Sequence, residues 1–449
     1  MKLDSLLGHA AEIYAHIEKS ALPPDRELEY FFRNRKYLGA RDRKIIAETV
    51  YHTLRHLKRI EYILSRQNQT GRSSDSGTLN AHVLVATGWY LLKKDQNDES
   101  LTSYYDFLHT HQFFKFLSKL DVNIAPQELG SSDPYTKEYL SVKHSFPVWM
   151  IDEITGLTRK QNPDVELAVL NQQAPTTLRT NTLKTTRERL LEILSGEGIA
   201  AAPTVHSPFG ITLSKRLNVF NMPSFKEGYF EMQDEGSQII GWMLDPKPNI
   251  KVFDACAGAG GKSLLLSMIM QNRGEIVASD IHSERLARLK MRARKAGAGN
   301  IRILEHDALQ PYEDTIHGKY DLALVDAPCS GLGTIRRNPG MKWTVTTKST
   351  KELSIKQSTI LRHCAQLVRP GGLLVYITCT FVAEENEKVA TDFLEKTNQF
   401  ESITPDVHLK KKELTGMSDG RFLRLNPWEH GTDLFFGALF RRRIEESHG

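Results

Sequence analysis

Two cysteines and one aspartate stand where strand-like segments end, and their side chains could make and break a covalent bond. Asp326 and Cys329 follow the apolar run LALV, and Cys379 follows the apolar run LVYIT. A cysteine at the rim of a sheet can act as a nucleophile when a nearby positive charge or helix dipole favours its thiolate. Cys364 falls inside an expected helix, where a buried cysteine is ordinarily a packing residue.

Such a set of groups suits methylation of cytosine at carbon 5, which is a poor nucleophile toward a methylsulfonium. A thiolate that adds at carbon 6 makes an enamine, so carbon 5 becomes nucleophilic. An acid near ring nitrogen 3 stabilises the charge that develops there. After methyl transfer, carbon 5 must lose its proton and the thiolate must leave. One cysteine, one acid and a second group that assists release would cover these tasks.

A glycine-rich turn upstream predicts a binding site for a nucleoside. The segment DACAGAGGKS runs from Asp254 to Ser263 and opens a helix, whose free N–H groups can face a ligand. A P-loop would have glycine at the position of Cys256, and the dinucleotide fingerprint G-x-G-x-x-G would have glycine at the position of Ser263. The segment therefore matches neither pattern. Asp280 and Asp307 end the next two strands, where a carboxylate suits a ribose diol, although each could also cap a helix. A nucleoside without a pyrophosphate, such as S-adenosylmethionine, fits this pattern.

The elements that must position these residues predict a doubly wound, mostly parallel sheet of the α/β class. From about Gly236 the chain alternates strands and helices, and the strands are continuously apolar, as strands buried on both faces should be. Ligands bind beyond the carboxyl ends of such strands. The expected strands are 251–256, 275–280, 301–307, 321–328, 373–379 and 434–441, and the expected helices are 262–270, 283–296, 351–368 and 384–394.

The composition divides the chain of 449 residues into three expected domains. These are a helical region at 1–142, a small α/β module at 143–235 and the sheet domain at 236–449. In the first region, apolar residues recur at helical spacing over 6–17, 45–64 and 83–92. The polar stretch 71–78 is an expected loop.

The overall composition excludes several classes of protein. A hydrophobic fraction of 40% and a charged fraction of 25% do not fit a disordered, collagen-like or coiled-coil chain. Four cysteines without a CxxC pair predict reduced thiols and no metal. There is no apolar run near the ~18 residues that a spanning helix needs, and acidic residues interrupt the N-terminal stretch. We therefore expect a cytoplasmic protein without a membrane partner.

The distribution of charge predicts a polyanionic partner. The formal net charge of +5 is modest, but nine lysines and arginines lie between Arg33 and Arg59, against Asp42 and Glu48. Patches of positive charge attract phosphate backbones and give salt-dependent binding.

The motifs closely resemble those of the Sun/Fmu-like (RsmB-type) family of RNA cytosine-5 methyltransferases. The matching stretches include DACAGAGGK, VASDIHSERL, DAPCSGLGTIRRNPGMKW and LVYITCTFVAEENE, and the resemblance spans at least 143–449. The stretch YLGARDRKIIAETVYHTLR at 37–55 resembles the NusB-type helical RNA-binding domain of the bacterial ribosomal RNA members. One departure is that Gly258 and Ala259 stand where many members have Ala and Pro.

The resemblance implies a class I methyltransferase domain with a Rossmann-like fold, and a role for each matching residue. Cys379 would be the nucleophile, Asp326 would contact the target cytosine, and Cys329 would assist breakdown of the covalent adduct. The residues that would line the S-adenosylmethionine pocket are Cys256, Ala257, Gly258, Ala259, Gly260, Gly261, Lys262, Asp280, Asp307 and Asp326. The residues expected to contact RNA are Arg336, Arg337, Lys342, Arg179 and Lys184, together with Arg41, Arg43 and Lys44 in the helical region.

The expected activity is S-adenosylmethionine-dependent methylation of an unstacked cytosine in 16S ribosomal RNA by a monomer. A transfer RNA cytosine-5 methyltransferase and a non-catalytic RNA-binding or ribosome-assembly factor on the same fold are the alternatives. A DNA cytosine-5 methyltransferase would take its nucleophile from the Pro-Cys motif at Cys329 and would not need Cys379. A dehydrogenase is disfavoured by the failed dinucleotide fingerprint.

Overall fold

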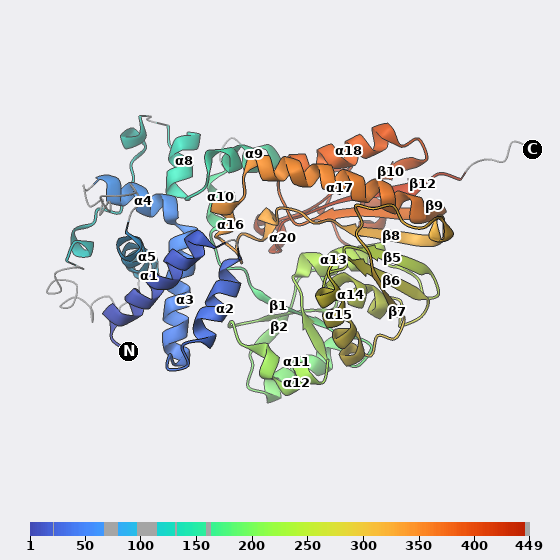
Figure 1. Ribbon diagram of the computed structural model, residues 1–449, viewed down its shortest axis with the longest axis horizontal. Helices are drawn as coiled ribbons and strands as arrows, with labels where there is room; N and C mark the ends of the chain where they lie inside the picture. Colours follow the sequence, from blue (N-terminus) through green and yellow to red (C-terminus); the bar gives the residue numbers. More distant parts are fainter. Residues whose placement is uncertain (21, 67–79, 97–114, 131–132, 159–162, 445–449) are drawn as a thin grey trace, which may run out of the picture. The chain divides into compact units, whose positions relative to one another are not determined.

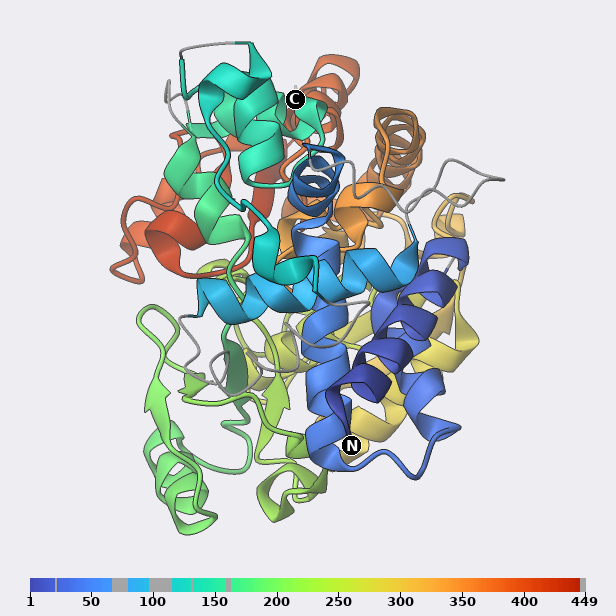
Figure 2. The same ribbon diagram turned by 90° about the vertical axis from the view of Figure 1, so that its left-hand side faces the viewer.

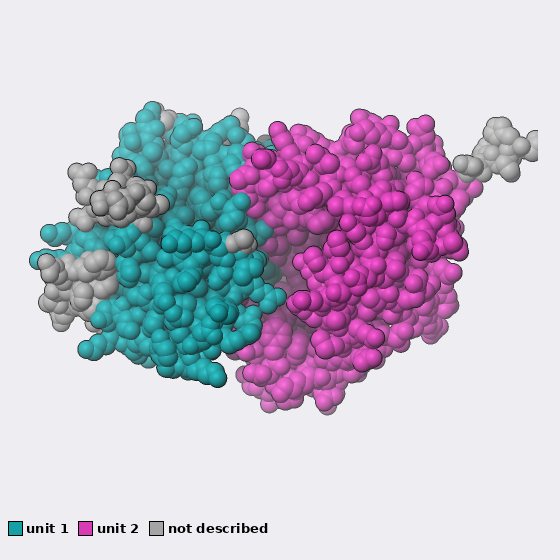
Figure 3. Space-filling model, viewed as in Figure 1, with its two compact units in different colours: residues 1–172, 335–344 teal, residues 173–334, 345–449 magenta. Residues whose placement is uncertain are grey.

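The computed structural model describes residues 1–20, 22–66, 80–96, 115–130, 133–158 and 163–444, so the loop expected at 71–78 lies outside the described residues. The chain forms two compact units, which Figure 3 shows in different colours. The helical unit comprises residues 1–172 and 335–344, and the sheet unit comprises 173–334 and 345–449. The three-domain division stays a prediction. Within the described ranges, no helix has the length and apolar content that crossing a membrane requires.

The helical unit is built around three long helices that pack on one another. Helices α1 and α3 both contact α5, and Figure 2 shows the light-blue α5 crossing α3. Gly88 of α5 permits this approach, because a Cβ there would collide with Thr53 of α3. The helices are α1 (Leu3–Lys19), α2 (Pro24–Arg33), α3 (Ala40–Arg55), α4 (Leu57–Arg66), α5 (Ala81–Asp95), η1 (Leu117–Lys119), η2 (Pro126–Leu129), α8 (Lys137–Lys143), α9 (Val148–Thr158), α10 (Asp164–Leu170) and α16 (Met341–Thr344).

The sheet unit begins with a small four-stranded antiparallel sheet in the order β2-β3-β1-β4. Helix α11 covers it with Leu190 and Leu194, which are buried against Leu178 of β1 and Phe230 of β4. The elements are β1 (Thr176–Thr180), α11 (Arg187–Gly196), β2 (Ala201–Pro203), β3 (Gly210–Leu213), η3 (Val219–Asn221), α12 (Pro223–Lys226) and β4 (Phe230–Met232).

The main sheet has the order β10-β12-β9-β8-β5-β6-β7, and β11 pairs with β12. Strands β5 to β9 are parallel, whereas β12 is antiparallel to β9 and β10 is antiparallel to β12. The strands are β5 (Lys251–Ala255), β6 (Glu275–Asp280), β7 (Ile301–Glu305), β8 (Tyr320–Asp326), β9 (Val368–Thr378), β10 (Phe400–Ile403), β11 (Leu423–Leu425) and β12 (Phe435–Arg442). This arrangement confirms the expected mostly parallel α/β sheet.

Helices cover both faces of the main sheet, as Figure 1 shows. Successive residues of β5 reach opposite cores, because Val252 packs with α13 and α14 whereas Phe253 packs with α17. The helices are α13 (Glu235–Leu244), α14 (Gly261–Ile269), α15 (Ser283–Ala296), α17 (Thr347–Leu367), α18 (Glu387–Lys396), α19 (Asp406–Lys410) and α20 (Pro427–His430), with short turns η4 (Asp314–Ile316), η5 (Leu332–Thr334) and η6 (Ala383–Glu385).

The order of the parallel strands reverses between β5 and β8. From β5 the chain moves outward through β6 to β7, then returns to the other side of β5 with β8 and β9. Ligands bind at such a switch point, beyond the carboxyl ends of the strands. The glycine turn follows β5, and the two cysteines follow β8 and β9, so the residues selected from the sequence share one edge of the sheet.

Replacement of Phe253 by alanine is expected to lower the free energy of unfolding of the sheet unit by about 3–5 kcal/mol. The Phe253 ring is fully buried and packs edge-on against Tyr312 and Tyr320, at centroid distances of 5.0 and 5.1 Å. Urea titration would measure the change, with Met291→Ala on the exposed face of α15 as the control. A loss below about 1 kcal/mol for Phe253→Ala would contradict a central role in the core.

Candidate active site

The structure brings the two rim cysteines together. Asp326, the last residue of β8, pairs in register with Ile377 of β9, and Cys379 directly follows β9. The Sγ atoms of Cys329 and Cys379 lie 3.5 Å apart, within hydrogen-bond distance for sulfur. Neither cysteine is in a disulfide, so this edge of the sheet presents two adjacent free thiols.

The environment of Cys329 favours its protonated form. The contact with Cys379 and burial together raise the pKa of the Cys329 thiol well above its usual value. Cys329 is therefore the partner suited to keep its proton and donate a hydrogen bond to the Cys379 sulfur.

A buried ion pair adds fixed charge beside the cysteines. Lys262, at the start of α14, places Nζ 2.7 Å from Oδ2 of Asp326. Burial lowers the pKa of Lys262, but the negative charge of Asp326 and the hydrogen bond to it outweigh that effect, so the pKa is raised overall. Lys262 is thus a lasting positive charge beside Asp326, and a cation close to a cysteine favours its thiolate.

The turn between β5 and α14 is tightly held by backbone hydrogen bonds. Cys256, Gly258 and Gly260 have φ values of 59°, 57° and 84°, so the turn contains a non-glycine residue in the left-handed region. Gly258 donates its N–H to Oδ2 of Asp280 at 2.9 Å, which joins the turn to the end of β6.

Burial raises the pKa of the Cys256 thiol well above its usual value. Cys256 is therefore a neutral thiol within the turn.

Two acids near the turn differ in their surroundings. Asp280 also accepts the N–H of His282 at 2.8 Å, so each of its carboxylate oxygens has a backbone donor. Asp307 accepts the N–H of Leu309 at 3.0 Å, which closes a local turn, and no helix begins there.

A buried carboxylate that the sequence interpretation missed links the two cysteine loops. Glu385 is fully buried, and its Oε2 accepts the N–H of Ser330 at 2.8 Å and the side-chain amide of Gln357 at 2.9 Å. The hydroxyl of Ser330 lies 2.9 Å from that of Thr380, next to Cys379. Gln357 also donates to the carbonyl of Pro328 at 3.0 Å. The available signal was the position of Glu385 inside the stretch LVYITCTFVAEENE.

Three of the residues predicted to contact RNA are buried in this structure, so their contact with RNA stays a prediction. Arg179 is 3% exposed and donates to Oε1 of Gln233 at 2.5 Å and to the carbonyl of Gly261 at 2.7 Å. Lys342 is 1% exposed and Arg336 is 6% exposed. A phosphate contact needs an accessible cation, which these side chains do not offer.

The remaining candidates for RNA contact are at least partly accessible. Lys184, Arg41 and Lys44 are exposed, and Arg337 and Arg43 are half-buried. Their contact with RNA stays a prediction.

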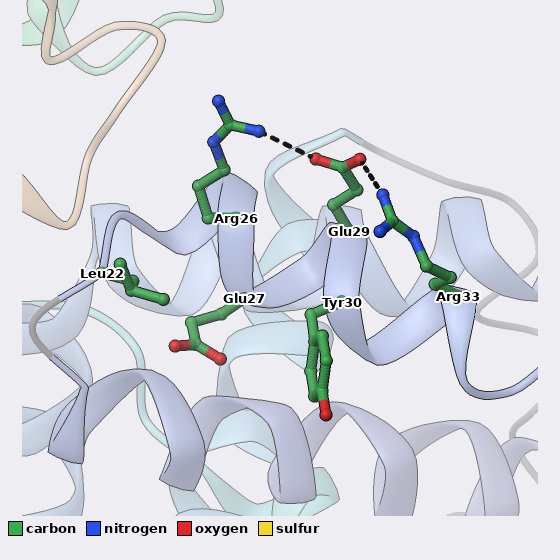
Figure 4. Close-up of a pocket in the computed structure, with 6 residues that line it drawn as sticks. All are labelled: Leu22, Arg26, Glu27, Glu29, Tyr30 and Arg33. Atoms are coloured by element: carbon green, nitrogen blue, oxygen red, sulfur yellow. Dashed lines mark hydrogen bonds and ion pairs between the residues drawn. The ribbon is translucent and has the colours of Figure 1, made fainter. Parts of the chain in front are cut away.

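A pocket on α2 holds none of the predicted site residues. In Figure 4, Glu29 lies between Arg26 and Arg33, at 3.3 and 2.7 Å, so both arginines are paired. The pocket is lined by Leu22, Arg26, Glu27, Glu29, Tyr30 and Arg33.

One group of side chains in the helical unit has the types and spacing of metal ligands. Nitrogen atoms of His52 and His56 and an oxygen of Asp95 lie within 4.8 Å of one another. Arg59, however, already contacts the Asp95 carboxylate at 3.3 Å. The positive charges of Arg55 and Arg59 act on both imidazoles and oppose a further cation. We therefore assign no metal to this group.

Comparisons with known proteins match most of the sheet unit and the residues of the helical unit that directly precede it. A family model described as 16S rRNA methyltransferase RsmB/F matches residues 241–441, and one described as an RsmF/B-like ferredoxin-like domain matches 146–220. Two curated relatives are each named "Probable ribosomal RNA small subunit methyltransferase B". The Synechocystis protein is 32% identical over 304 residues and the Bacillus subtilis protein 34% over 308, with 68% of both chains covered in each comparison.

A solved structure resembles nearly the whole chain. The crystal structure of PH0851 is 25% identical, with a TM-score of 0.76, and the likeness covers 98% of this chain and 99% of that chain. The likeness therefore extends over both compact units.

Replacement of Asp254 by asparagine is expected to remove part of the pH dependence of stability. Asp254 is fully buried at the end of β5, and burial raises its pKa from 3.8 to about 7. A raised pKa means that the native state binds a proton that the unfolded chain releases. The resulting stability is fully present below about pH 4 and is lost as the pH rises through about 7.

Urea titrations at about pH 5 and about pH 7 would measure this effect. The free energy of unfolding of the wild type should fall over that interval by up to about 1.4 kcal/mol per pH unit. Asp254→Asn should fall less. The same decline in both proteins would mean that the Asp254 carboxyl does not hold its proton in the native state.

Replacement of Glu385 by alanine is expected to lower the free energy of unfolding by about 2–4 kcal/mol. The Ser330 N–H and the Gln357 amide would lose their shared acceptor, at about 1–3 kcal/mol for each unpaired group. Glu385→Gln keeps one carbonyl oxygen and should lose less. The matched control is Glu384→Ala, which removes only the partly exposed ion pair with Lys388. Equal losses for Glu385→Ala and Glu384→Ala would show that the shared acceptor does not support the two loops.

Proposed function

Because this chain belongs to the RsmB/F family of 16S ribosomal RNA methyltransferases, we propose that it methylates carbon 5 of a cytosine in 16S ribosomal RNA through a covalent bond between Cys379 and carbon 6. The observation that carries this chemistry is the pair of free thiols, with sulfurs 3.5 Å apart, beside the Lys262–Asp326 ion pair. A second cysteine in contact with the first is placed to assist the breakdown of a covalent adduct.

The residues at the glycine turn fit S-adenosylmethionine, which supplies an electrophilic methyl group when bound. At Gly258 no atom lies within 4 Å of where a Cβ would stand, so the backbone of the turn is open on that side. Asp280 supplies a carboxylate at the end of β6, where ribose hydroxyls are bound in such folds. Lys262 is committed to Asp326 and is not free for a phosphate, which favours a nucleoside without a pyrophosphate.

The first part of the proposed reaction forms the bond to the base. Lys262 favours the thiolate of Cys379, which adds to carbon 6 of the cytosine. The electron pair that moves onto the ring is stabilised at nitrogen 3 by a hydrogen bond that the Lys262 ammonium donates while it is paired with Asp326. Carbon 5 then takes the methyl group.

The second part releases the product. A base takes the proton from carbon 5, and the electron pair of that C–H bond expels the Cys379 sulfur from carbon 6. The departing thiolate accepts a hydrogen bond from Cys329, whose thiol keeps its proton in this environment. Cys329 therefore assists the step in which the adduct breaks.

The target cytosine must leave its stack to expose carbon 6 to a nucleophile, so we propose a single-stranded or extruded nucleotide. The accessible basic residues Arg41, Lys44 and Lys184 are proposed to hold the surrounding RNA backbone. We further propose that the protein acts as a monomer in the cytoplasm.

Covalent trapping tests the proposal. Cys329→Ala, Cys379→Ala and the double variant would each be mixed with 16S ribosomal RNA and S-adenosylmethionine and run on a denaturing gel. We expect a slow-migrating RNA adduct only for Cys329→Ala, because that variant keeps the nucleophile and loses the group that assists release. Mapping the adduct would identify the nucleotide.

Two other results would change the assignment. An adduct that forms only when Cys329 is kept would reverse the roles of the two cysteines. If no variant traps 16S RNA and the wild type transfers no methyl group to it, the 16S assignment fails, and transfer RNA is the next substrate to test.

A further inference from the structure

Lys342 is a buried cation that the proposed reaction does not use. It belongs to the segment 335–344, which is part of the helical unit although the chain on both sides of it belongs to the sheet unit. Its side chain is 1% exposed, so the structure does not present it to RNA.

All three N–H bonds of the Lys342 ammonium have an oxygen acceptor within the helical unit. Nζ lies 2.9 Å from the carbonyl of Arg55, 3.0 Å from the carbonyl of Ser145 and 2.7 Å from Oδ1 of Asn171. The ring of Phe146 completes the enclosure, with its centroid 3.8 Å from Nζ. No carboxylate takes part in these contacts.

The acceptors explain how a lysine without a carboxylate can be buried. Arg55 ends α3, Ser145 lies two residues after α8, and Asn171 is the C-cap of α10. The last carbonyls of a helix lack partners in the helix and carry partial negative charge. The ammonium of Lys342 therefore stands close to the ends of three helices, where it donates to the last carbonyl of α3, to the carbonyl of Ser145 and to the side-chain oxygen of Asn171.

Neighbouring contacts hold the same segment to the end of α3. The indole N–H of Trp343 donates to the carbonyl of Leu54 at 2.7 Å. In the opposite direction, the guanidinium of Arg55 donates to the carbonyl of Arg336 at 2.9 Å. The segment is thus fixed to α3 near both of its ends.

Both ends of the segment lead by the backbone to the cysteine loops. Two residues before it, Gly333 donates its N–H to the carbonyl of Cys379 at 2.9 Å. A side chain at Gly333 would collide with that carbonyl and with the carbonyl of Leu434, so the approach requires glycine. Shortly after the segment, α17 begins and carries Gln357, which bonds to Glu385 and to the carbonyl of Pro328.

We propose that Lys342 is a positioning residue of the reaction, because it fixes the segment 335–344 and, through the chain on either side, the placement of Cys329 and Cys379. This inference rests on the proposed function, because it assigns a role in the same covalent chemistry.

The test compares Lys342→Met with Lys348→Met, each made in the full-length Cys329→Ala protein, which is expected to accumulate the adduct and serves as the reference in place of the wild type. Methionine has a similar length and removes the ammonium, and Lys348 is an exposed lysine on α17 that serves as the matched control. At saturating RNA, we expect the single-turnover rate of adduct formation to fall at least about tenfold in Lys342→Met, with the RNA dissociation constant within about twofold of the reference. Lys348→Met should behave as the reference.

A readout independent of activity is amide hydrogen exchange followed by mass spectrometry. In Lys342→Met we expect faster exchange in peptides that cover 327–346 and the end of α3, and unchanged exchange in β5 and β6. If neither Cys329→Ala nor Cys329→Ala/Lys348→Met traps RNA, the proposed function fails, and this exchange pattern still tests the role of Lys342 in fixing the segment.

Several outcomes would overturn the inference. Weaker RNA binding with an unchanged rate at saturation would make Lys342 an RNA contact. Lower thermal stability with an unchanged rate would make it a purely structural residue, and no change in any readout would leave it without a role. If Lys342→Met does not fold, Trp343→Phe replaces it in the test. This variant removes the indole donor to the carbonyl of Leu54, which also holds the segment to α3, and it should slow adduct formation in the same way. An unchanged rate in Trp343→Phe would then overturn the inference.

Discussion

The register between β8 and β9 is the constraint on which the site depends. Asp326 is paired with Ile377, so the loops after the two strands start at the same level of the sheet, and the sulfurs of Cys329 and Cys379 meet. Tyr376 and Ile377 are buried on opposite faces of the sheet. A slip of one residue would exchange these faces, so the apolar cores on both sides hold the register.

The register of the strands does not fix the loops that extend beyond them. Hydrogen bonds of two buried side chains, Glu385 and Lys342, hold these loops in addition. Glu385 binds the Cys329 loop through the Ser330 N–H, and the Ser330 hydroxyl meets Thr380 of the Cys379 loop. Burial raises the pKa of Glu385, and hydrogen bonds from Ser330 and Gln357 oppose that rise. Ser330 and Gln357 therefore stabilise the charged form of Glu385, and Glu385 in turn fixes the positions of these two residues. The second side chain, Lys342, holds the segment that extends the same loop into the helical unit.

The sequence predicted the parts of this arrangement that depend on local pattern. Apolar runs located β5, β6 and β8, and the residues that follow them marked the functional edge, because in parallel sheets that edge lies at the strand ends. Burial of single charged residues was not predictable in the same way. Arg179 bonds to the carbonyl of Gly261, and Lys342 bonds to the carbonyl of Ser145, 197 positions away. Positive charge is visible in a sequence, but the oxygens that surround it come from distant segments.

The two buried lysines show why residue type alone does not reveal function. Lys262 faces the carboxylate of Asp326, and that negative charge keeps the pKa of Lys262 raised in spite of burial. Lys342 faces carbonyl oxygens at helix ends, and burial together with Arg55 lowers its pKa. A cation beside a carboxylate and a thiol can act on charge that changes during a reaction. A cation enclosed by neutral carbonyls and an aromatic ring has fixed partners, so its effect on the chemistry must pass through the backbone that it holds.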